Sequence, residues 1–426
     1  MPATLPPTPS VQRFDQGSHA MRFGLFMAPF HRAGEHPTLA LQRDLELVEV
    51  LDALGYDEVW VGEHHSGGRE LIADPAVFIA AAAERTKQIR LGTGVASLPY
   101  HHPFMVADKM VLLDHLTRGR AMLGVGPGIL ASDAYMLGIE APEQRRMMNE
   151  SLDVILRLLR GETVSAQTDW FTLREAHLQL PNYTRPHLPV SVAASFTPSG
   201  PVAAGRHGIG LLSVAGASHE AFERTWGWVE EEAAQSGASV SRADWSVVLT
   251  MHLAETREQA IADVARGFEV RAYAGDSGAP NSGQSFGVTG KTIEEAMEGN
   301  PGLIFGTPED AIEALDTIVE RSGGIGGVLF IHHEWASVEA TARSFELFQR
   351  HVAPRYRAGD GAHLLQTREW FDTRGRSAFA SAGEAQARAF TDAGKAIPAD
   401  LAERMRVMAE RRAARAAADT ERAGGK

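Results

Sequence analysis

The chain has 426 residues, 44% of them hydrophobic, which is enough to bury one large core. Its formal net charge of −13 disfavours nonspecific binding to nucleic acid or to an anionic membrane, so we expect small molecules as partners. The chain has no cysteine, which excludes disulfides, thiolate nucleophiles and thiolate-bound metals. No apolar run reaches the roughly 20 residues that a membrane helix needs.

The first 20 residues contain prolines but no basic stretch followed by an apolar one. This composition predicts a disordered leader over 1–20 rather than a signal peptide, and a cytoplasmic location is the default expectation. The leader ends before "MRFGLF", the first run typical of a strand, so we expect the folded part to begin at residue 21.

From Arg22 onward, short apolar or β-branched runs alternate with longer segments of helical period. Strands are expected at 22–30, 57–65, 89–99, 120–128, 189–195, 209–214, 245–255 and 326–335. Amphipathic helices such as 38–56 and 102–117 lie between them. Eight repeats of this kind predict an α/β protein with a (β/α)8 TIM barrel over 21–356; an open doubly wound sheet is the alternative.

Three segments interrupt or follow the repeats. The aromatic residues and prolines within 168–186 predict a hairpin laid over the barrel. The Gly, Ser and Asn content of 275–302 predicts a lid. The remaining segment, 357–426, is rich in Arg, Ala and acidic residues, which predicts a C-terminal helical tail that is solvated or contacts another copy.

Unusual polar residues gather where the strands end, which is where (β/α)8 enzymes hold their working groups. They are His31, Glu63, His64, His65, His101, His102, Ser195 to Ser199, His332, His333 and Glu334. Adjacent side chains of a strand point to opposite faces, so His64 and His65 are poorly arranged for a shared metal, and we expect no metal site. Any one of these histidines could equally be a hydrogen-bonded rim residue.

Two further stretches are compatible with ligand binding. In "AASFTPSGPVAAGRHG" (193–208) a strand enters a helix through small hydroxyl residues, so the helix N-terminus could hold a phosphate, although ordinary capping explains the pattern almost as well. The glycines of "GVGPG" (124–128) would let a ligand approach the backbone, or form a plain turn. Neither a Rossmann nor a P-loop pattern is present.

The order of "MRFGLF", "DEVWVGEHH", "IRLGTGVASLPYHHP", "VLLDHLTRGRAMLGVGPG" and "SGPVAAGRHG" closely resembles the bacterial luciferase-like, flavin-dependent monooxygenases. The resemblance covers 21–356. Within that family, 251–264 and 332–354 look most like limonene 1,2-monooxygenases. The resemblance to the family implies reduced FMN from a separate flavin reductase, molecular oxygen, a flavin C4a-peroxide, and a small apolar substrate such as a monoterpene or an alicyclic compound. A homodimer is expected.

The resemblance also implies roles for particular residues. His64 and His102 match histidines beside the flavin and are the expected catalytic residues, with Glu63 and His65 flanking His64. Gly94 and Val95 match a pair that forms a cis peptide under the flavin ring. Expected cofactor-binding residues are Glu63, Gly94, Val95, Gly126, Ser195, Phe196 and Ser199, the last three near the phosphate.

This sequence departs from luciferase at Gly126 and Pro127, where luciferase has a reactive cysteine and a phosphate-binding arginine. The first change argues against light emission, and the second leaves the phosphate partner open, with Arg145 and Arg206 as candidates. Alternatives are an oxidoreductase that uses reduced deazaflavin for hydride transfer on the same fold, a noncatalytic flavin-binding subunit, and a metal-dependent hydrolase.

Overall fold

The computed structural model describes residues 21–27, 31, 34–195, 197–213, 218–275, 291–357, 360–408 and 410. Its contacts divide the chain into two compact units, residues 1–358 and 359–426, each of which is described by itself. The leader predicted over 1–20 lies outside the described residues. Within the described ranges, no helix is long and apolar enough to cross a membrane.

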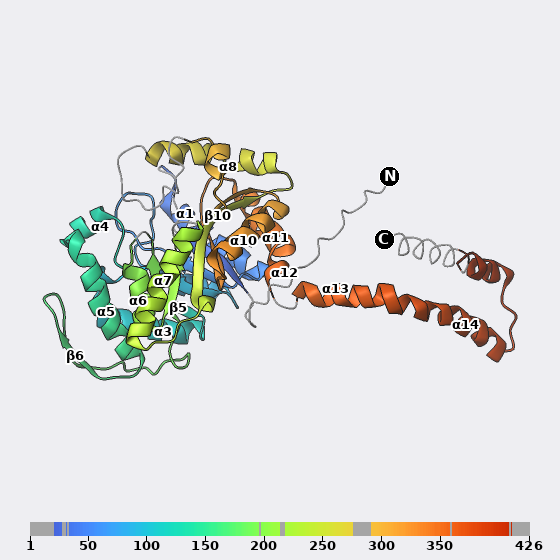
Figure 1. Ribbon diagram of the computed structural model, residues 1–426, viewed down its shortest axis with the longest axis horizontal. Coiled ribbons are helices and arrows are strands. Elements are labelled where there is room, and N and C mark those ends of the chain that lie inside the picture. The colour runs from blue at the N-terminus through green and yellow to red at the C-terminus, as the bar shows by residue number, and fades with distance from the viewer. Residues whose placement is uncertain are drawn as a thin grey trace. The chain divides into compact units, whose positions relative to one another are not determined.

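The first unit is a closed parallel barrel, as the sequence predicts (Figure 1). Every neighbouring pair in the ring is parallel, and the ring closes between the last strand and the first. In order around the ring the strands are β1 (Arg22–Met27), β2 (Glu58–Val61), β3 (Arg90–Thr93), β5 (Ala121–Gly126), β8 (Val190–Ala194), β9 (Gly210–Ser213), β10 (Trp245–Leu253) and β12 (Gly327–Ile331). The alternative of an open doubly wound sheet is therefore wrong.

Two short strands extend this ring. β4 (Ala96–Ser97) pairs with the end of β5, and β11 (Leu303–Gly306) pairs with the second half of β10. β11 was not predicted from the sequence. β10 is nine residues long, and its first half alone closes the ring against β9 and β12. The exposed edge of its second half is then free to accept another strand.

Helices connect the strands and cover the outside of the barrel (Figure 1). They are α1 (Pro37–Leu54), α2 (Pro75–Arg85), α3 (Pro103–Thr117), α4 (Ala131–Met136), α5 (Gln144–Leu159), α6 (Ser199–His207), α7 (His219–Ser236), α8 (Arg257–Gly275), α9 (Ile293–Met297), α10 (Pro308–Ser322), α11 (Val338–His351) and α12 (Ala353–Tyr356). Local signals set several boundaries: α1 starts at a proline and stops at the left-handed Gly55, and Thr307 and Asp310 form a capping box on α10.

The barrel interior is filled by side chains from six of its eight strands rather than left as a channel. Seven buried residues form this inner cluster: Phe26, Trp60, Met122, Leu212, Val248, Leu329 and Ile331. Trp60 is the largest, and glycines on the neighbouring strands make room for it. A Cβ on Gly92 would lie 2.5 Å from the Trp60 ring, and one on Gly124 would lie 2.1 Å from the Thr93 carbonyl oxygen. Glycine is therefore required at both positions for the barrel core to pack this closely.

The two predicted insertions have different outcomes. A hairpin is present, but its strands are β6 (Val164–Gln167) and β7 (Thr172–Ala176), so it begins before the predicted range and packs against α5. Trp170 at its turn donates a hydrogen bond to Glu150 on that helix. The central part of the predicted lid, 276–290, lies outside the described residues, and its C-terminal part forms α9. The lid role stays a prediction.

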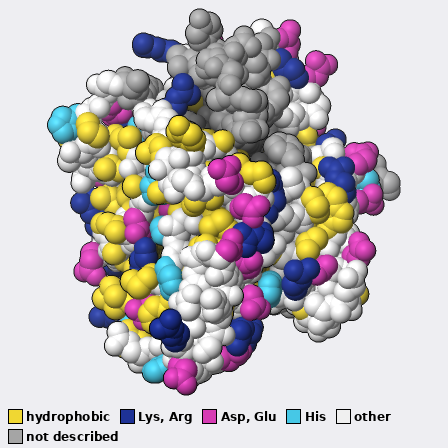
Figure 2. Space-filling model, turned by 90° about the vertical axis from the view of Figure 1, so that its left-hand side faces the viewer, with side chains coloured by type: hydrophobic (Ala, Val, Ile, Leu, Met, Phe, Trp, Pro, Cys, Tyr) yellow, Lys and Arg dark blue, Asp and Glu magenta, His cyan; other side chains and the backbone are white. Residues whose placement is uncertain are grey.

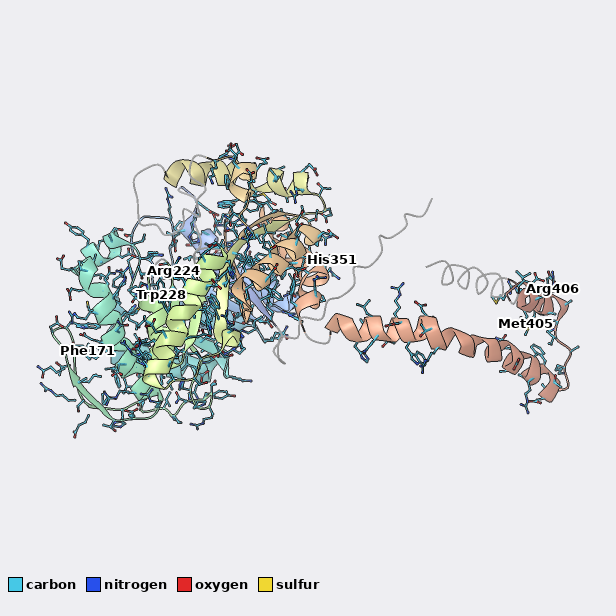
Figure 3. The ribbon with its side chains drawn as sticks, viewed as in Figure 1. Phe171, Arg224, Trp228, His351, Met405 and Arg406 are labelled. Carbon is cyan, nitrogen blue, oxygen red and sulfur yellow. The ribbon has the colours of Figure 1, made fainter. Side chains whose placement is uncertain are left out.

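The second unit is helical where it is described, as predicted for the tail. It contains α13 (Asp360–Trp370), a π-helical turn (Phe371–Gly375), α14 (Arg376–Asp392) and further helical residues at 399–408. Its described side chains are largely exposed, and Arg406, labelled in Figure 3, forms ion pairs with Glu403 and Glu410 one turn to either side. These helix-surface pairs stabilise such a segment only weakly.

Candidate functional site

One open cavity of about 980 Å³ lies at the carboxyl ends of β2, β3, β5 and β8. This is the end of a parallel barrel at which the working residues of (β/α)8 enzymes gather. Its lining comprises Phe26, Gly62, Glu63, His64, Glu70, Gly94, Val95, Ser97, Gly126, Pro127, Gly128, Ile129, Arg145, Met148, Ala193, Ala194, Ser195, Thr197, Ser199 and Gly200. Phe26 of β1 also contributes, so the cavity joins residues from five βα units.

Most of the residues expected from the sequence meet in this cavity. Glu63, His64, Gly94, Val95, Gly126, Ser195 and Ser199 all line it. Phe196 lies outside the described residues. His102 is not among the lining residues: it precedes α3, is exposed, and places its ring 6.1 Å from that of Phe171, labelled on the hairpin in Figure 3. The structure does not bring His102 to the site, because the turn before α3 directs His101 inward instead.

His64 is held between two carboxylates. Its Nδ1 lies 3.1 Å from Asp133 Oδ2, and its Nε2 lies 3.2 Å from Glu70 Oε2. The His64 side chain is 11% exposed and that of Asp133 only 1%. Asp133 comes from α4, which follows β5, and Glu70 comes from the loop after β2. Neither acid was singled out from the sequence, since no local pattern marks an acid that pairs with a residue 69 positions away.

Glu63 forms a second polar group beside His64. Its buried carboxylate accepts hydrogen bonds from the backbone N–H of Ser97 (2.6 Å) and contacts His65 Nε2 (3.0 Å) and His101 Nε2 (2.6 Å). Glu63 therefore ties the loop after β2 to the segment after β3. Its oxygens are engaged by protein donors, so its part at the cavity wall is to hold neighbouring residues in place.

One wall of the cavity is formed by closely approaching backbone. The peptide bond between Gly94 and Val95 is cis, which confirms the expectation drawn from the resemblance. A Cβ on Gly126 would lie 2.6 Å from Val95 Cγ2, and one on Gly94 would lie 2.7 Å from Trp60 Cβ. Glycine is therefore required at both positions for this close packing, and the wall here is formed by Gly94, Val95 and Gly126.

The opposite end of the cavity has unsatisfied hydrogen-bonding capacity. Ser199 begins α6, and its buried Oγ has no hydrogen-bond partner among the described residues. The next residue, Gly200, packs so closely that a Cβ would lie 2.2 Å from the Ala193 carbonyl oxygen. With free N–H groups at the start of the helix, this end has the donors that a phosphate needs.

Arg145 supplies a positive charge to the cavity. It is exposed at the start of α5 and has no ion-pair partner within the described part of the chain, whereas Arg206, the other candidate, is paired with Glu232 on the outer surface. Gln144 beside it donates hydrogen bonds to the Pro127 carbonyl oxygen (2.8 Å) and the Tyr100 hydroxyl (3.1 Å). These bonds fix the loop after β5.

The Tyr100 hydroxyl stays protonated at neutral pH. Burial, followed by the negative charge of Asp133, raises the pKa of Tyr100 to about 12. Its oxygen accepts from Gln144, and the positive-φ residue Gly128 leaves space for it, since a Cβ there would lie 2.3 Å from that oxygen. Tyr100 is therefore a neutral structural support of the loop.

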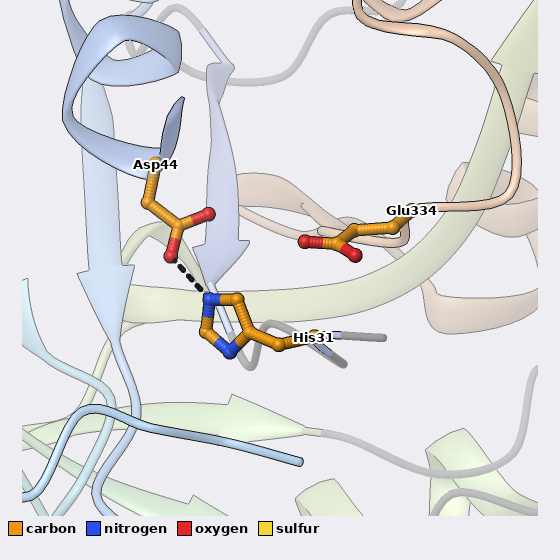
Figure 4. A group of neighbouring side chains, drawn as sticks. All are labelled: His31, Asp44 and Glu334. Atoms are coloured by element: carbon orange, nitrogen blue, oxygen red, sulfur yellow. Dashed lines mark hydrogen bonds and ion pairs between the residues drawn. The ribbon is translucent and has the colours of Figure 1, made fainter. Parts of the chain in front are cut away.

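A second buried polar cluster joins the ends of β1 and β12 (Figure 4). One donor atom from each of His31, Asp44 and Glu334 lies within 4.8 Å of the others, a spacing compatible with a metal ion. His31 Nε2, however, hydrogen-bonds Asp44 directly at 2.9 Å, and Arg43 forms ion pairs with Glu334 and Glu35. These protein cations already balance the carboxylates, so we assign no metal here.

The protonation of this pair follows from its surroundings. Burial opposes the charged form of His31, but the hydrogen bond to Asp44 and its charge outweigh burial and raise the pKa of His31. Burial likewise opposes the Asp44 carboxylate, but the hydrogen bond from His31 and the nearby His332, whose Nε2 lies 3.5 Å from Asp44 Oδ1, outweigh it and lower the pKa of Asp44. The pair is thus an imidazolium and a carboxylate that tie α1 to the Arg69 carbonyl oxygen, which His31 also contacts.

Hydrophobic side chains gather on the side of the barrel unit that carries α4 and α5 in Figure 1, as Figure 2 shows. Around α4 the exposed large residues are Ile129, Tyr135, Met136 and Leu137, and on α3 they are Met105, Leu112 and Leu116. Single exposed apolar residues are ordinary, but grouped ones are typical of contact surfaces.

A closed barrel with histidine, carboxylate and arginine side chains gathered in one cavity at its strand ends defines an enzyme of the (β/α)8 class. A family model described as luciferase-like monooxygenase matches residues 21–325, nearly three quarters of the chain. The chain therefore belongs to the luciferase-like monooxygenases, a family of flavin-dependent oxidoreductases, as its sequence motifs suggested.

Two relatives are similar over most of their length. The chain is 46% identical to a limonene 1,2-monooxygenase from Rhodococcus erythropolis over 80% of this chain and 88% of the relative. It is 45% identical to a 4-hydroxyprotoasukamycin monooxygenase from Streptomyces nodosus subsp. asukaensis over 78% and 92%. Among solved structures, the FMN complex of the oxygenating constituent of 3,6-diketocamphane monooxygenase from Pseudomonas putida has the same fold, with a TM-score of 0.67, 23% identity and coverage of 79% and 98%.

Proposed function

We propose that this protein uses reduced FMN and O2 to oxygenate a small apolar substrate, with epoxidation of a cyclic alkene such as a monoterpene as the first reaction to test. The strongest support is the identity to the limonene 1,2-monooxygenase across almost the whole barrel. The lining of the cavity supports an apolar substrate, since Phe26, Val95, Ile129 and Met148 all contribute to it.

The residues of the cavity fit FMN. The closely packed wall at Gly94, Val95 and Gly126 leaves room for the isoalloxazine ring, and Arg145 and Ser199 suit the phosphate of FMN. In this arrangement Arg145 takes the place of the arginine that Pro127 replaces. Reduced FMN would supply the two electrons of the reaction, by which one oxygen atom of O2 enters the substrate and the other leaves as water.

The reaction needs proton transfers at the cavity, and His64 is placed to carry them out. It lines the cavity, and an imidazole gains and loses protons near neutral pH more readily than other side chains. The apolar part of the lining limits access of water, which favours transfer of oxygen to the substrate over release of hydrogen peroxide.

The proposal is tested by anaerobic titration with reduced FMN and, separately, reduced deazaflavin, followed by mixing with O2 and limonene. We expect reduced FMN to bind and limonene epoxide to form, and His64→Ala to bind reduced FMN similarly but release mainly hydrogen peroxide. Binding of deazaflavin alone would favour hydride transfer instead. Binding of reduced FMN without turnover of any alkene, ketone or other apolar compound would favour a noncatalytic flavin-binding subunit.

We also propose that the enzyme works with a separate flavin reductase and as a homodimer. The sequence has no Rossmann pattern for binding a nicotinamide cofactor that would reduce the flavin, and this supports a separate reductase. The exposed face of α3, with Met105, Leu112 and Leu116, supports a contact with a second copy. Sedimentation should give twice the chain mass, and Leu112→Glu combined with Leu116→Glu should reduce it to the monomer if α3 lies in the interface.

A further inference from the structure

The contacts of His64 restrict where its protons lie. Asp133 Oδ1 faces the backbone N–H of His65 at 3.2 Å and also contacts the Ser66 hydroxyl. A backbone N–H can only donate, so Oδ1 is an acceptor and the carboxylate plane is fixed. The second oxygen, Oδ2, then faces His64 Nδ1 at 3.1 Å.

This orientation selects one form of the imidazole ring. An unprotonated Oδ2 can only accept, so Nδ1 must carry a hydrogen. When the ring is neutral, its lone pair is therefore on Nε2. Nε2 lies 3.2 Å from Glu70 Oε2, and both His64 and Glu70 line the cavity. Nε2 is therefore the nitrogen through which His64 can exchange a proton with a ligand in the cavity.

We infer that Asp133 is a positioning residue that fixes the tautomer of His64 and so leaves Nε2 as the nitrogen that exchanges a proton with ligands of the site. The assignment of the tautomer stands on the contacts alone. The use of the proton in oxygen transfer rests on the proposed function.

The short helix α4 carries Asp133. It spans Ala131–Met136, and its third residue is the buried Asp133, whereas the neighbouring Ser132 is exposed and contacts the Ser66 hydroxyl at 2.6 Å. Asp133 is thus the one side chain through which α4 reaches His64. Ser132 provides a matched control on the same helix.

The experiment combines nitrogen NMR with turnover, using protein labelled with ¹⁵N-histidine. His64→Gln identifies the His64 signals by their disappearance. In the wild type and in Ser132→Ala we expect a protonated Nδ1. In Asp133→Asn the side-chain carbonyl keeps the bond from the His65 N–H and turns the amide NH2 toward His64, so we expect Nδ1 to lose its hydrogen and Nε2 to gain one.

Turnover is measured as product and hydrogen peroxide formed for each reduced FMN consumed. For Asp133→Asn we expect product to fall by about 10²-fold and peroxide to rise, because general acid–base catalysis typically contributes that much. Affinity for reduced FMN should change less than about twofold in Asp133→Asn, since Asp133 does not line the cavity.

Several results would overturn the inference. One is a wild-type ring that carries its hydrogen on Nε2 with a bare Nδ1, a measurement that needs no folded variant. Others are an Asp133→Asn protein with the wild-type tautomer, or an Asp133→Asn protein with the wild-type product yield. If the wild type forms no product with reduced FMN, the proposed function fails, while the NMR result still decides the tautomer.

Discussion

Replacement of Arg145 by alanine should weaken binding of FMN while leaving binding of riboflavin, which lacks the phosphate, unchanged. A hydrogen bond to a charged partner contributes about 1.5–3 kcal/mol, equivalent to roughly 10- to 150-fold in Kd. Arg145 is exposed at the cavity edge, and solvent screening lowers its contribution. We therefore expect the lower limit, about a tenfold increase in the Kd of FMN.

The assay is a flavin fluorescence titration of both ligands against the wild type and two variants. The neighbouring residue Arg146 provides the matched control, because it is occupied by Glu143, Glu150 and Asp169 and does not line the cavity. Arg146→Ala should leave both dissociation constants unchanged. Use of riboflavin separates loss of the phosphate contact from general damage to the site.

Two outcomes would refute the reasoning. If Arg145→Ala weakens FMN and riboflavin equally, the arginine acts on the ring or on the shape of the cavity rather than on the phosphate. If Arg146→Ala has the same effect as Arg145→Ala, the effect comes from the total charge of α5. Either result would mean that a residue other than Arg145 binds the phosphate in place of the arginine that is missing at Pro127.

Further predictions concern binding and stability. Ser199→Ala should weaken FMN but not riboflavin, with an unchanged free energy of unfolding, because the Ser199 Oγ has no described partner to lose; a fall in stability would contradict this. Asp44→Asn should lower the free energy of unfolding by about 3 kcal/mol at pH 5.5. Because the pKa of His31 is raised, this loss of stability is full below pH 6.5 and shrinks as the pH rises through the pKa of His31 in the folded protein. Because the pKa of Asp44 is lowered, the loss also shrinks as the pH falls below 3.8. Urea unfolding of both proteins across this pH range tests the two changes, and a difference in stability that does not vary with pH would refute them. Gly124→Ala should cost roughly 3 kcal/mol or prevent folding, since its Cβ would lie 2.1 Å from the Thr93 carbonyl oxygen, and thermal melting measures this.

The position of the cavity could be predicted from the sequence, but only part of its chemistry. The run "DEVWVGEHH" contains a buried strand followed by polar residues, so this local pattern and the family resemblance together predict Glu63 and His64 as residues of the site. Of the two histidines that follow β3, the resemblance pointed to His102, which does not line the cavity. Both follow the same strand, and the turn before α3 alone determines that His101 reaches Glu63 while His102 stays outside.

The sequence by itself determined the eightfold repeat, the order of strands around the ring and the strand ends at which polar residues gather. These features follow from hydrophobic period and from residues close together in the chain. Only the tertiary structure decided the partners of those residues. Asp133 meets His64 across 69 positions, and Arg145 is left for the cavity because Arg146 and Arg206 already have acidic partners. Such choices depend on closure of the barrel and on side-chain direction, neither of which leaves a local pattern in the sequence.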